Sequence, residues 1–461
     1  MNASVSVPTP AEGEPGGGAS SSSGAAEGPT GAGAAVAEAT TLGAKKTRAE
    51  LRAASAGTER HWHPRRWLVA ALVVVLVGAV ALVAVVRLRA PLPSAEITPG
   101  AGPVVSVSGS PAPLAWPSTG EAAVAIPKLG VVSQSGAEAP VPVASLTKVM
   151  TAYLVLKDHP LPAGDDGPSF TMTAADAAAL VADSGQDQSS VEVAPGEVLD
   201  ERQLLDGLLV HSANNFADFL AAWDAGSTSA FVAEMNAEAA ALGMHNTHFV
   251  DDSGFNAQSV STPADMLKVA TLALQEPAFA AGVAMPDVTL PVAGQVSSYT
   301  PLVGTENVIG VKSGFTDAAG GCDILALHQV VAGQSVVVLA AVTGQQGADV
   351  LGVAGAAAHA LAQSASAQIV AQKVLTAGEE VAKASTVGEA VPVVTTRSAE
   401  VLAWPGQHAT RTLEVTAHPV AGTQAGALVG TASATLGTQV VHAPARTTRA
   451  LPRPSLAQRL F

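Results

Sequence analysis

The sequence ASLTKVMTA, which forms the segment Ala144–Ala152, places a serine hydroxyl and a lysine amine three residues apart. Apolar residues recur at helical spacing through this segment, which predicts a helix from Ser145 to about Lys157. Residues at i and i+3 lie on the same face of a helix, so Ser145 and Lys148 are expected to be neighbours. An amine beside a hydroxyl is what an amine-activated serine nucleophile requires. The pair alone is common in helices, so the rest of the chain decides its meaning.

Helix-like and strand-like patterns alternate around this segment, which predicts a mixed α/β chain. Helical spacing or capping signals predict helices over Ser145–Lys157, Asp200–Val210, Phe216–Trp223, Phe231–Leu242, Thr262–Gln275 and Asp349–Leu375. Short apolar runs between turn residues predict strands over Ala122–Ile126, Leu129–Ser133, Val308–Val311, Ile324–Val331 and Ser335–Val342. The last two strands are joined by a short turn at Gly333, which favours a hairpin.

Changes of composition divide the chain into six predicted parts. They are a disordered cytoplasmic tail (1–66), a transmembrane helix (67–86), a proline-rich linker (87–117), a mixed α/β domain (118–376), a small β domain (387–441) and a C-terminal tail (442–461). The first part is rich in glycine, alanine and serine without an apolar period, so it has too little apolar surface to offset the entropy of ordering.

The segment Trp67–Val86 is apolar throughout and is long enough to span a bilayer. A signal peptide has a shorter apolar region nearer the N-terminus, so a membrane anchor is the favoured interpretation. Seven lysine and arginine residues lie between 45 and 66, whereas Arg87 and Arg89 follow the segment closely. This excess of positive charge predicts a single-pass protein with its N-terminus in the cytoplasm and the following domains outside the cell membrane.

The overall composition excludes some classes of function. The net charge is −15 and only 13% of residues are charged, so the composition gives no support for a nucleic-acid partner, which would need clustered lysine and arginine. Cys322 is the single cysteine, which excludes an intrachain disulfide and leaves the core to hold the domain together. The histidines and acids form no recognisable zinc spacing, so neither a metal nor a cofactor is expected. Asp251 and Asp252 are interpreted as loop-capping carboxylates, and His211 as a packed or exposed residue at a helix end.

Three short motifs occur in order along the mixed domain: Ser145-x-x-Lys148, Ser212-x-Asn214 and Lys312-Ser313-Gly314. The first is predicted at a helix start, the second in a turn between helices, and the third at the end of a strand. Each is common alone, but the ordered set is that of penicillin-binding proteins and class A β-lactamases.

The residues around these motifs resemble D-alanyl-D-alanine carboxypeptidases, the penicillin-sensitive serine peptidases of low molecular mass that act on bacterial cell walls. The resemblance covers roughly Glu121–Gly344 and includes the stretches 144–152, 208–215, 252–255 and 310–316. It implies an α/β (α+β) fold of the β-lactamase and penicillin-binding-protein type, in which helices and a helical subdomain flank an antiparallel sheet. The later β region would be the small stalk domain that many members carry.

The resemblance also implies the roles of the site residues. Ser145 would attack the penultimate D-alanine of a peptidoglycan stem peptide, with Lys148 as its base once burial and the nearby Lys312 depress the lysine pKa. The amides of Ser145 and Phe315 would form the oxyanion hole. Ser212 would relay a proton, Asn214 would hold the peptide amide, and the third motif would bind the terminal carboxylate. The predicted catalytic residues are therefore Ser145, Lys148, Ser212 and Asn214, and the predicted substrate-binding residues are Lys312, Ser313, Gly314 and Phe315.

Three positions depart from the usual family pattern. Ser313 replaces a threonine but keeps the hydroxyl, Phe255 stands where leucine is frequent, and His211 stands where proline is common. Two alternatives remain open. A β-lactamase of class A would need a further glutamate for deacylation, and no Glu-x-x-Leu-Asn-like stretch follows Asn214. A non-catalytic wall-binding or scaffold protein would have no chemical reason to keep all of the motif residues. The expected partners are stem peptides ending in D-Ala-D-Ala, β-lactams as inhibitors, and the membrane.

Overall fold

The computed structural model describes residues 64–461 apart from 101, 103, 179–187 and 306. The chain separates into two units, 1–79 and 80–461. The helix α1 (Pro64–Arg89) contains the predicted transmembrane segment, and by length and composition it could cross a membrane. Its leucine and valine side chains are exposed on all sides, as expected for a helix without an amphipathic face. The predicted N-terminal tail lies outside the described residues, except for 64–66, which belong to α1.

A five-stranded antiparallel sheet forms the centre of the mixed domain. Its strands, in spatial order, are β11 (Val308–Thr316), β12 (Gly320–Val331), β13 (Gln334–Gln345), β3 (Glu121–Ile126) and β4 (Val131–Ser135). The predicted hairpin between β12 and β13 is present, with Val331 opposite Gln334. Its two turn residues, Ala332 and Gly333, both have positive φ, as the right-handed twist of such hairpins requires.

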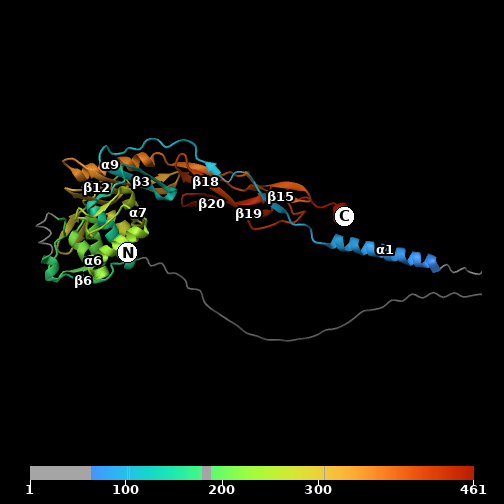
Figure 1. Cartoon of the computed structure of the whole chain (residues 1–461), viewed down its shortest axis with the longest axis horizontal. Helices are drawn as coiled ribbons and strands as arrows, with labels where there is room; N and C mark the ends of the chain where they lie inside the picture. The colour runs from blue at the N-terminus through green and yellow to red at the C-terminus, as the bar shows by residue number, and fades with distance from the viewer. Residues whose placement is uncertain (1–63, 101, 103, 179–187, 306) are drawn as a thin grey trace, which may run out of the picture. The chain divides into compact units, whose positions relative to one another are not determined.

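Both faces of this sheet are covered by helices (Figure 1). On β3, Ala122 and Val124 pack with the small apolar stripe of α9 (Val350–Ser366). The alternate residues Ala123 and Ala125 belong to the larger core on the opposite face. That core contains residues of α2 (Lys148–Asp158), α4 (Glu201–Val210), α5 (Asn214–Ala225), α6 (Thr228–Ala241), α7 (Pro263–Ala273) and α8 (Pro277–Val283). Two-sided burial explains why these strands are apolar throughout.

Capping chemistry sets several helix boundaries. Asp200 accepts a hydrogen bond from the backbone of Gln203 and forms a capping box at the start of α4. Thr262 caps α7 through the amide of Asp265, as the sequence predicted.

The other short elements around the helices are η1 (Pro127–Leu129), β5 (Val141–Pro142), η2 (Ala144–Thr147), β6 (Ser169–Thr171), β7 (Val198–Asp200), β8 (Val260–Ser261), β9 (Asp287–Leu290) and β10 (Gly294–Ser297).

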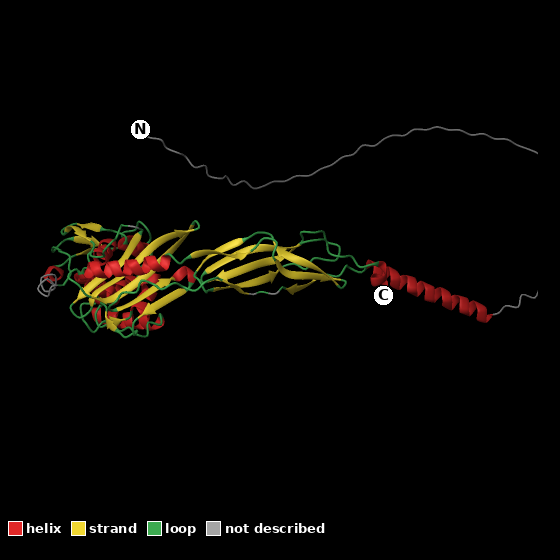
Figure 2. Cartoon of the chain, turned by 90° about the horizontal axis from the view of Figure 1, so that it is seen from above, coloured by secondary structure: helices red, strands yellow, loops and turns green. Residues whose placement is uncertain are grey.

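A second, seven-stranded sheet forms the C-terminal part of the chain (strands in yellow, Figure 2). Its spatial order is β1 (Glu96–Pro99), β15 (Glu380–Thr386), β16 (Glu389–Thr395), β20 (Gln439–Thr447), β19 (Leu428–Leu436), β18 (His408–Val415) and β2 (Val104–Ser106). The pair β14 (Val370–Leu375) and β17 (Ala399–Ala403) lies beside it, and α10 (Leu456–Leu460) follows. Alanine and valine side chains fill the two cores of this region.

The structure differs from the sequence-based boundaries at several places. The proline-rich segment 87–117 contributes both edge strands of the second sheet, β1 and β2, where missing amide donors are tolerated. The helix predicted over Asp349–Leu375 ends at Ser366, and its last residues form β14. The predicted C-terminal tail contains the end of β20 and α10. The strand predicted over Val308–Val311 extends to Thr316, so the third motif lies within β11.

Candidate active site

Ser145 lies in a strained turn that precedes the helix predicted for it. The segment η2 (Ala144–Thr147) is a 3₁₀ turn, and α2 begins only at Lys148. Ala144 has a φ of 47°, which is uncommon for a residue with a side chain. Strain of this kind persists where surrounding structure enforces it, and it often marks functional sites. The turn leaves Ser145 half-buried, whereas its neighbours Ala144 and Leu146 are fully buried.

Lys148 is held directly beneath this serine. Its Nζ lies 3.0 Å from Ser145 Oγ and donates a second hydrogen bond to the carbonyl of Ser253 at 2.9 Å. The side chain has 0% exposure. Thr151, one turn further along α2, donates to the carbonyl of Asp252 at 2.6 Å and so ties the same loop to the helix. The lysine amine is therefore fixed at hydrogen-bond distance from the serine hydroxyl, away from bulk solvent.

Burial determines the protonation of Lys148. Removal from water lowers the lysine pKa to about 7, against the opposing effect of the carboxylates of Asp252, Asp251 and Asp218. Burial, followed by repulsion from Asp218 and Asp251, raises the pKa of Asp252 to about 8. The expected depression of the lysine pKa is therefore present through burial, whereas Lys312, the second expected cause, is not among the groups that shift it. Near neutral pH a substantial share of Lys148 is the neutral amine, which is the form able to accept a proton.

The second motif lies where α4 ends and α5 begins. Ser212 has a φ of 60°, and its buried Oγ makes no hydrogen bond with the part of the chain that the structure describes. Asn214 is the first residue of α5, and its amide Nδ2 donates to Gln188 Oε1 at 2.5 Å. The backbone amide of Asn214 donates to the carbonyl of Ser189 at 2.8 Å. The hydrogen-bonding capacity of this buried hydroxyl is therefore unused among the described residues, and Asn214 is the residue of the second motif that lines the cavity at Ser145.

The third motif is buried along β11. Lys312 has 0% exposure, and its Nζ donates to the carbonyl of Ser313 at 2.9 Å. Burial lowers the pKa of Lys312 well below its usual range, and the charge of Lys148 acts in the same direction. The hydroxyl of Ser313 donates to the carbonyl of Tyr299 at 2.8 Å, and its amide donates to Thr300 Oγ1 at 3.2 Å. The loop at Tyr299 and Thr300 thus fixes the serine of this motif.

The three motifs meet around one cavity. Gly314 packs so closely on the backbone of Ser145 that a Cβ atom there would lie 2.6 Å from the Ser145 amide nitrogen. A cavity of about 550 Å³ opens at this point. Its lining contains residues of all three regions, namely Ser145, Gln188, Ser189, Asn214, Gly254, Phe255, Ala257, Phe315, Thr316, Asp317 and Ala318. A glycine at 314 is needed because β11 lies directly against the serine turn.

Three carboxylates, those of Asp251, Asp252 and Asp323, lie around the two lysines of the site, and the sequence indicated the role of only the first. Asp251 is a loop-capping carboxylate as predicted, since it accepts hydrogen bonds from Ser253 Oγ and the Asn256 amide. Asp252 is also interpreted from the sequence as a loop-capping carboxylate, but it interacts electrostatically with Lys148. The pKa values of both groups are strongly shifted. Asp323 on β12 is fully buried, and burial raises its pKa well above the usual range while Lys312 opposes the shift. Carboxyl groups on neighbouring elements thus tune both lysines.

His211 and Cys322 match their structural interpretations. The His211 ring stacks on Tyr299 with centroids 4.6 Å apart, and its Nδ1 lies 3.0 Å from the carbonyl oxygen of Ser297. It therefore packs at the end of α4, as expected. Cys322 is fully buried, and burial raises the pKa of its thiol to about 12, so it is an inert core residue.

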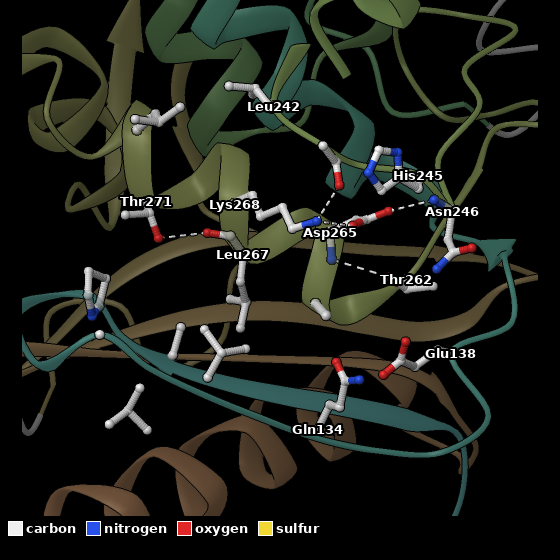
Figure 3. Close-up of a pocket in the computed structure, with 18 residues that line it drawn as sticks. Gln134, Glu138, Leu242, His245, Asn246, Thr262, Asp265, Leu267, Lys268 and Thr271 are labelled. Atoms are coloured by element: carbon white, nitrogen blue, oxygen red, sulfur yellow. Dashed lines mark hydrogen bonds and ion pairs between the residues drawn. The ribbon is translucent and has the colours of Figure 1, made fainter. Parts of the chain in front are cut away.

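A second, larger cavity of about 630 Å³ lies between β4 and α7 and contains no motif residue (Figure 3). Two of its three carboxylate and ammonium groups are paired, whereas the third, Glu138, is exposed: Lys268 donates to Asp265 Oδ1 at 2.8 Å, and Asp265 Oδ2 accepts from the Asn246 amide at 2.9 Å. A site for polar chemistry would instead offer convergent groups with unused hydrogen-bonding capacity. We therefore assign the chemistry to the smaller cavity at Ser145.

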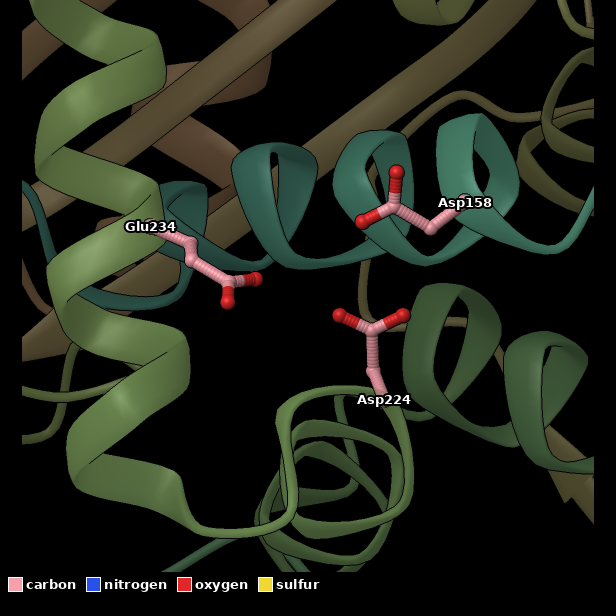
Figure 4. A group of neighbouring side chains, drawn as sticks. All are labelled: Asp158, Asp224 and Glu234. Atoms are coloured by element: carbon pink, nitrogen blue, oxygen red, sulfur yellow. The ribbon is translucent and has the colours of Figure 1, made fainter.

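Three carboxylates, those of Asp158, Asp224 and Glu234, lie close together elsewhere on the helical side (Figure 4). Asp224 Oδ1 is 2.9 Å from His159 Nε2, and the His159 ring stacks on Trp223. Asp158 and Glu234 are exposed to solvent. Because the most buried of the three acids already has a partner, we assign no metal to this cluster.

Gly254 offers a test of how tightly the serine turn is held. It has a φ of 77°, and a Cβ at this position would lie 1.9 Å from the carbonyl oxygen of Ala144. We expect Gly254→Ala to lose about 1 kcal/mol from the positive φ and about 1–3 kcal/mol more from the collision, measured by urea unfolding. Gly196→Ala is the matched control, because its φ is 89° and nothing lies within 4 Å of the added atom. Equal losses for the two variants would contradict this close packing.

Comparison with known proteins agrees with this geometry. The S11 peptidase family, described as D-alanyl-D-alanine carboxypeptidase, matches residues 128–343. Residues 128–343 of the chain are thus similar to the D-alanyl-D-alanine carboxypeptidases of this family. It is 34% identical over 194 residues to a D-alanyl-D-alanine endopeptidase of Pseudomonas aeruginosa, a match that covers 40% of this chain and 59% of the relative. It is 36% identical over 146 residues to a D-alanyl-D-alanine carboxypeptidase of Mycobacterium tuberculosis, covering 30% and 50%. The chain thus spans about half the length of the curated relatives it matches.

Solved structures confirm the predicted fold of this D,D-peptidase domain. Penicillin-binding protein 5 from Haemophilus influenzae aligns with a TM-score of 0.52 at 18% identity, over 75% of this chain and 100% of that one. A peptidoglycan synthesis regulatory factor (PBP3) from Streptococcus pneumoniae aligns with a TM-score of 0.54 at 19% identity, over 74% and 100%. Because these alignments are longer than the family match at 128–343, the likeness in fold extends beyond the D,D-peptidase domain.

Proposed function

We propose that this protein is a membrane-anchored serine D-alanyl-D-alanine carboxypeptidase that removes the terminal D-alanine from peptidoglycan stem peptides through an acyl-enzyme on Ser145. The observation that carries this proposal is the 3.0 Å contact between Ser145 Oγ and Lys148 Nζ, with the lysine pKa lowered to about 7. A serine hydroxyl is a weak nucleophile until a base takes its proton, and a neutral buried amine is such a base.

The contact between Ser145 and Lys148 supports the following proposed reaction. Lys148 accepts the proton of Ser145 as its Oγ forms a bond to the carbonyl carbon of the penultimate D-alanine. The oxyanion accepts hydrogen bonds from the backbone amides of Ser145 and Phe315. When the peptide bond breaks, Ser212 Oγ relays the proton held by Lys148 to the departing amine, so the terminal D-alanine leaves and Lys148 is neutral again. Water then attacks the ester carbonyl and gives one proton to Lys148, which passes it to Ser145 Oγ as the ester bond breaks and the shortened peptide is released.

The remaining motif residues, Asn214, Lys312 and Ser313, would hold the substrate on either side of the scissile bond. Asn214 is proposed to bind the peptide amide with its side chain. Lys312 and Ser313 are proposed to bind the terminal carboxylate, which distinguishes this substrate from an internal peptide bond. Among the described residues that line the cavity there is no glutamate. A class A β-lactamase uses such a residue to activate the deacylating water, so the cavity favours a peptidase.

Membrane anchoring is part of the proposal and rests on α1. Residues 65–89 have a mean hydropathy of 3.2 over their most apolar window and are not buried in the protein. The excess of basic residues before the apolar segment supports the proposed orientation, with the N-terminus in the cytoplasm and the peptidase domain outside. The full chain should therefore sediment with membranes and resist alkaline carbonate extraction. Its recovery in the soluble fraction would contradict the proposed membrane anchor.

The activity is tested with the full chain in detergent. A fluorescent penicillin should label it covalently, and a peptide ending in D-Ala-D-Ala should release free D-alanine. Rapid penicillin turnover without D-alanine release would favour a β-lactamase, and the absence of both reactions would favour a non-catalytic wall protein. The similarity to an endopeptidase supplies a further comparison. If the protein cleaves a cross-linked dimer peptide but releases no D-alanine from the D-Ala-D-Ala peptide, its activity is that of an endopeptidase.

A further inference from the structure

The charge of the active-site cavity indicates which part of a substrate occupies it. Among its described lining residues, Asp317 is the one charged side chain. A terminal carboxylate in this cavity would meet Asp317 without a compensating cation, which is unfavourable in a partly enclosed site. Lys312 and Ser313 are buried and do not line the cavity. The cavity therefore holds the part of the peptide that precedes the scissile bond.

Asp317 is available to a ligand. It lies in the turn between β11 and β12, is exposed, and has no hydrogen-bond or ion-pair partner in the described part of the chain. The turn is well defined, because the amide of Ala319 donates to both the carbonyl and the Oγ1 of Thr316. Phe255 and Phe315 line the same cavity with 40% and 46% exposure. Aromatic surface beside a carboxylate suits a side chain with an aliphatic stem and a cationic end.

Resting on the proposed function, we propose that this cavity selects stem peptides whose residue before D-Ala-D-Ala carries a free side-chain amine, with Asp317 as the partner of that amine. The aliphatic stem of the residue packs on Phe255 and Phe315, and the ammonium group pairs with Asp317. Acylation of the amine removes its charge and adds a group to the crowded end of the cavity. Stems already cross-linked through this amine are therefore poorer substrates than free stems.

The test compares two peptides on the full chain in detergent. Nα-acetyl-L-Lys-D-Ala-D-Ala keeps the side-chain amine, and the Nα,Nε-diacetyl peptide lacks its charge. D-alanine release should have a kcat/KM about threefold to fivefold higher for the free amine, the range expected of a partly exposed ion pair. The preference should shrink as salt is added, because salt screens such a pair. The salt series needs no variant, so it tests the ion pair in the native chain.

Two variants complete the experiment. Asp317→Asn should bring the kcat/KM values of the two peptides together. Asp166→Asn is the matched control: it removes one exposed carboxylate outside the cavity and should keep the wild-type ratio. Equal rates for the two peptides in the wild-type protein, or an unchanged ratio in Asp317→Asn, would overturn the inference. Failure of the proposed function is a distinct result, since neither peptide would then release D-alanine and penicillin would not label the protein.

Discussion

Replacing Ser145 with alanine should abolish covalent labelling by a fluorescent penicillin and reduce D-alanine release by about 10⁴-fold or more, as expected when a covalent nucleophile is lost. The Oγ atom is the acceptor of the acyl group, and no other hydroxyl lies at hydrogen-bond distance from Lys148 Nζ among the described residues. The labelled band on a denaturing gel is the measurement for acylation, and an amine-detection assay follows the release of D-alanine.

The fold should survive this change, which separates lost chemistry from lost structure. Ser145 is half-buried, so the removal of one oxygen leaves little cavity. The urea unfolding midpoint of Ser145→Ala should therefore stay close to that of the wild type. Ser133→Ala, on strand β4 and outside the active-site cavity, is the matched control and should keep its label. A Ser145→Ala protein that still forms a stable penicillin adduct would refute the acyl-enzyme assignment.

Sequence reasoning was most successful where a function depends on residues close together in the chain. The spacing of Ser145 and Lys148 predicted their contact because the geometry of a helical turn places i and i+3 together. The same reasoning predicted a capped start for α7 at Thr262 and the hairpin at Gly333. Local backbone geometry sets these features, so they are visible in a short window of sequence.

Features that depend on packing between distant segments could not be predicted in this way. The second hydrogen bond of Lys148 goes to Ser253, a residue 105 positions away, and its acceptor is a backbone carbonyl without a sequence signal. The proline-rich segment contains β1 and β2 because edge strands accept residues that cannot donate, and composition alone does not distinguish such a strand from a linker. The environment of Asp252 likewise depends on burial by other elements.

Replacing Lys148 with methionine should reduce penicillin acylation by about 10² to 10⁴-fold, the usual contribution of a positioned general base. Methionine is apolar and of similar length, so it suits a site with 0% exposure and leaves no buried charge behind. The measurement is the second-order rate of label formation. A loss of less than about tenfold would show that another group takes the serine proton.

The pH dependence tests the same role without removing the side chain. Only the neutral amine accepts a proton, and the neutral fraction grows as the pH rises through the lysine pKa of about 7. The acylation rate should therefore rise between about pH 6 and about pH 8 and then level off. A lysine at its ordinary pKa would give a rate that continues to rise at higher pH. Because Lys148 and Asp252 interact, the observed midpoint belongs to the pair.

Asp252→Asn should move this midpoint to lower pH. The ionised carboxylate of Asp252 stabilises the charged form of Lys148 and so raises its pKa, in opposition to burial. An amide at this position removes that stabilisation, and the contributions of Asp251 and Asp218 remain. Asp166→Asn removes an exposed carboxylate that is not among the causes of the Lys148 pKa shift, so it should leave the midpoint unchanged. An unchanged midpoint in Asp252→Asn would mean that Asp252 is already neutral throughout this range, and an upward shift would contradict the effect assigned to its carboxylate.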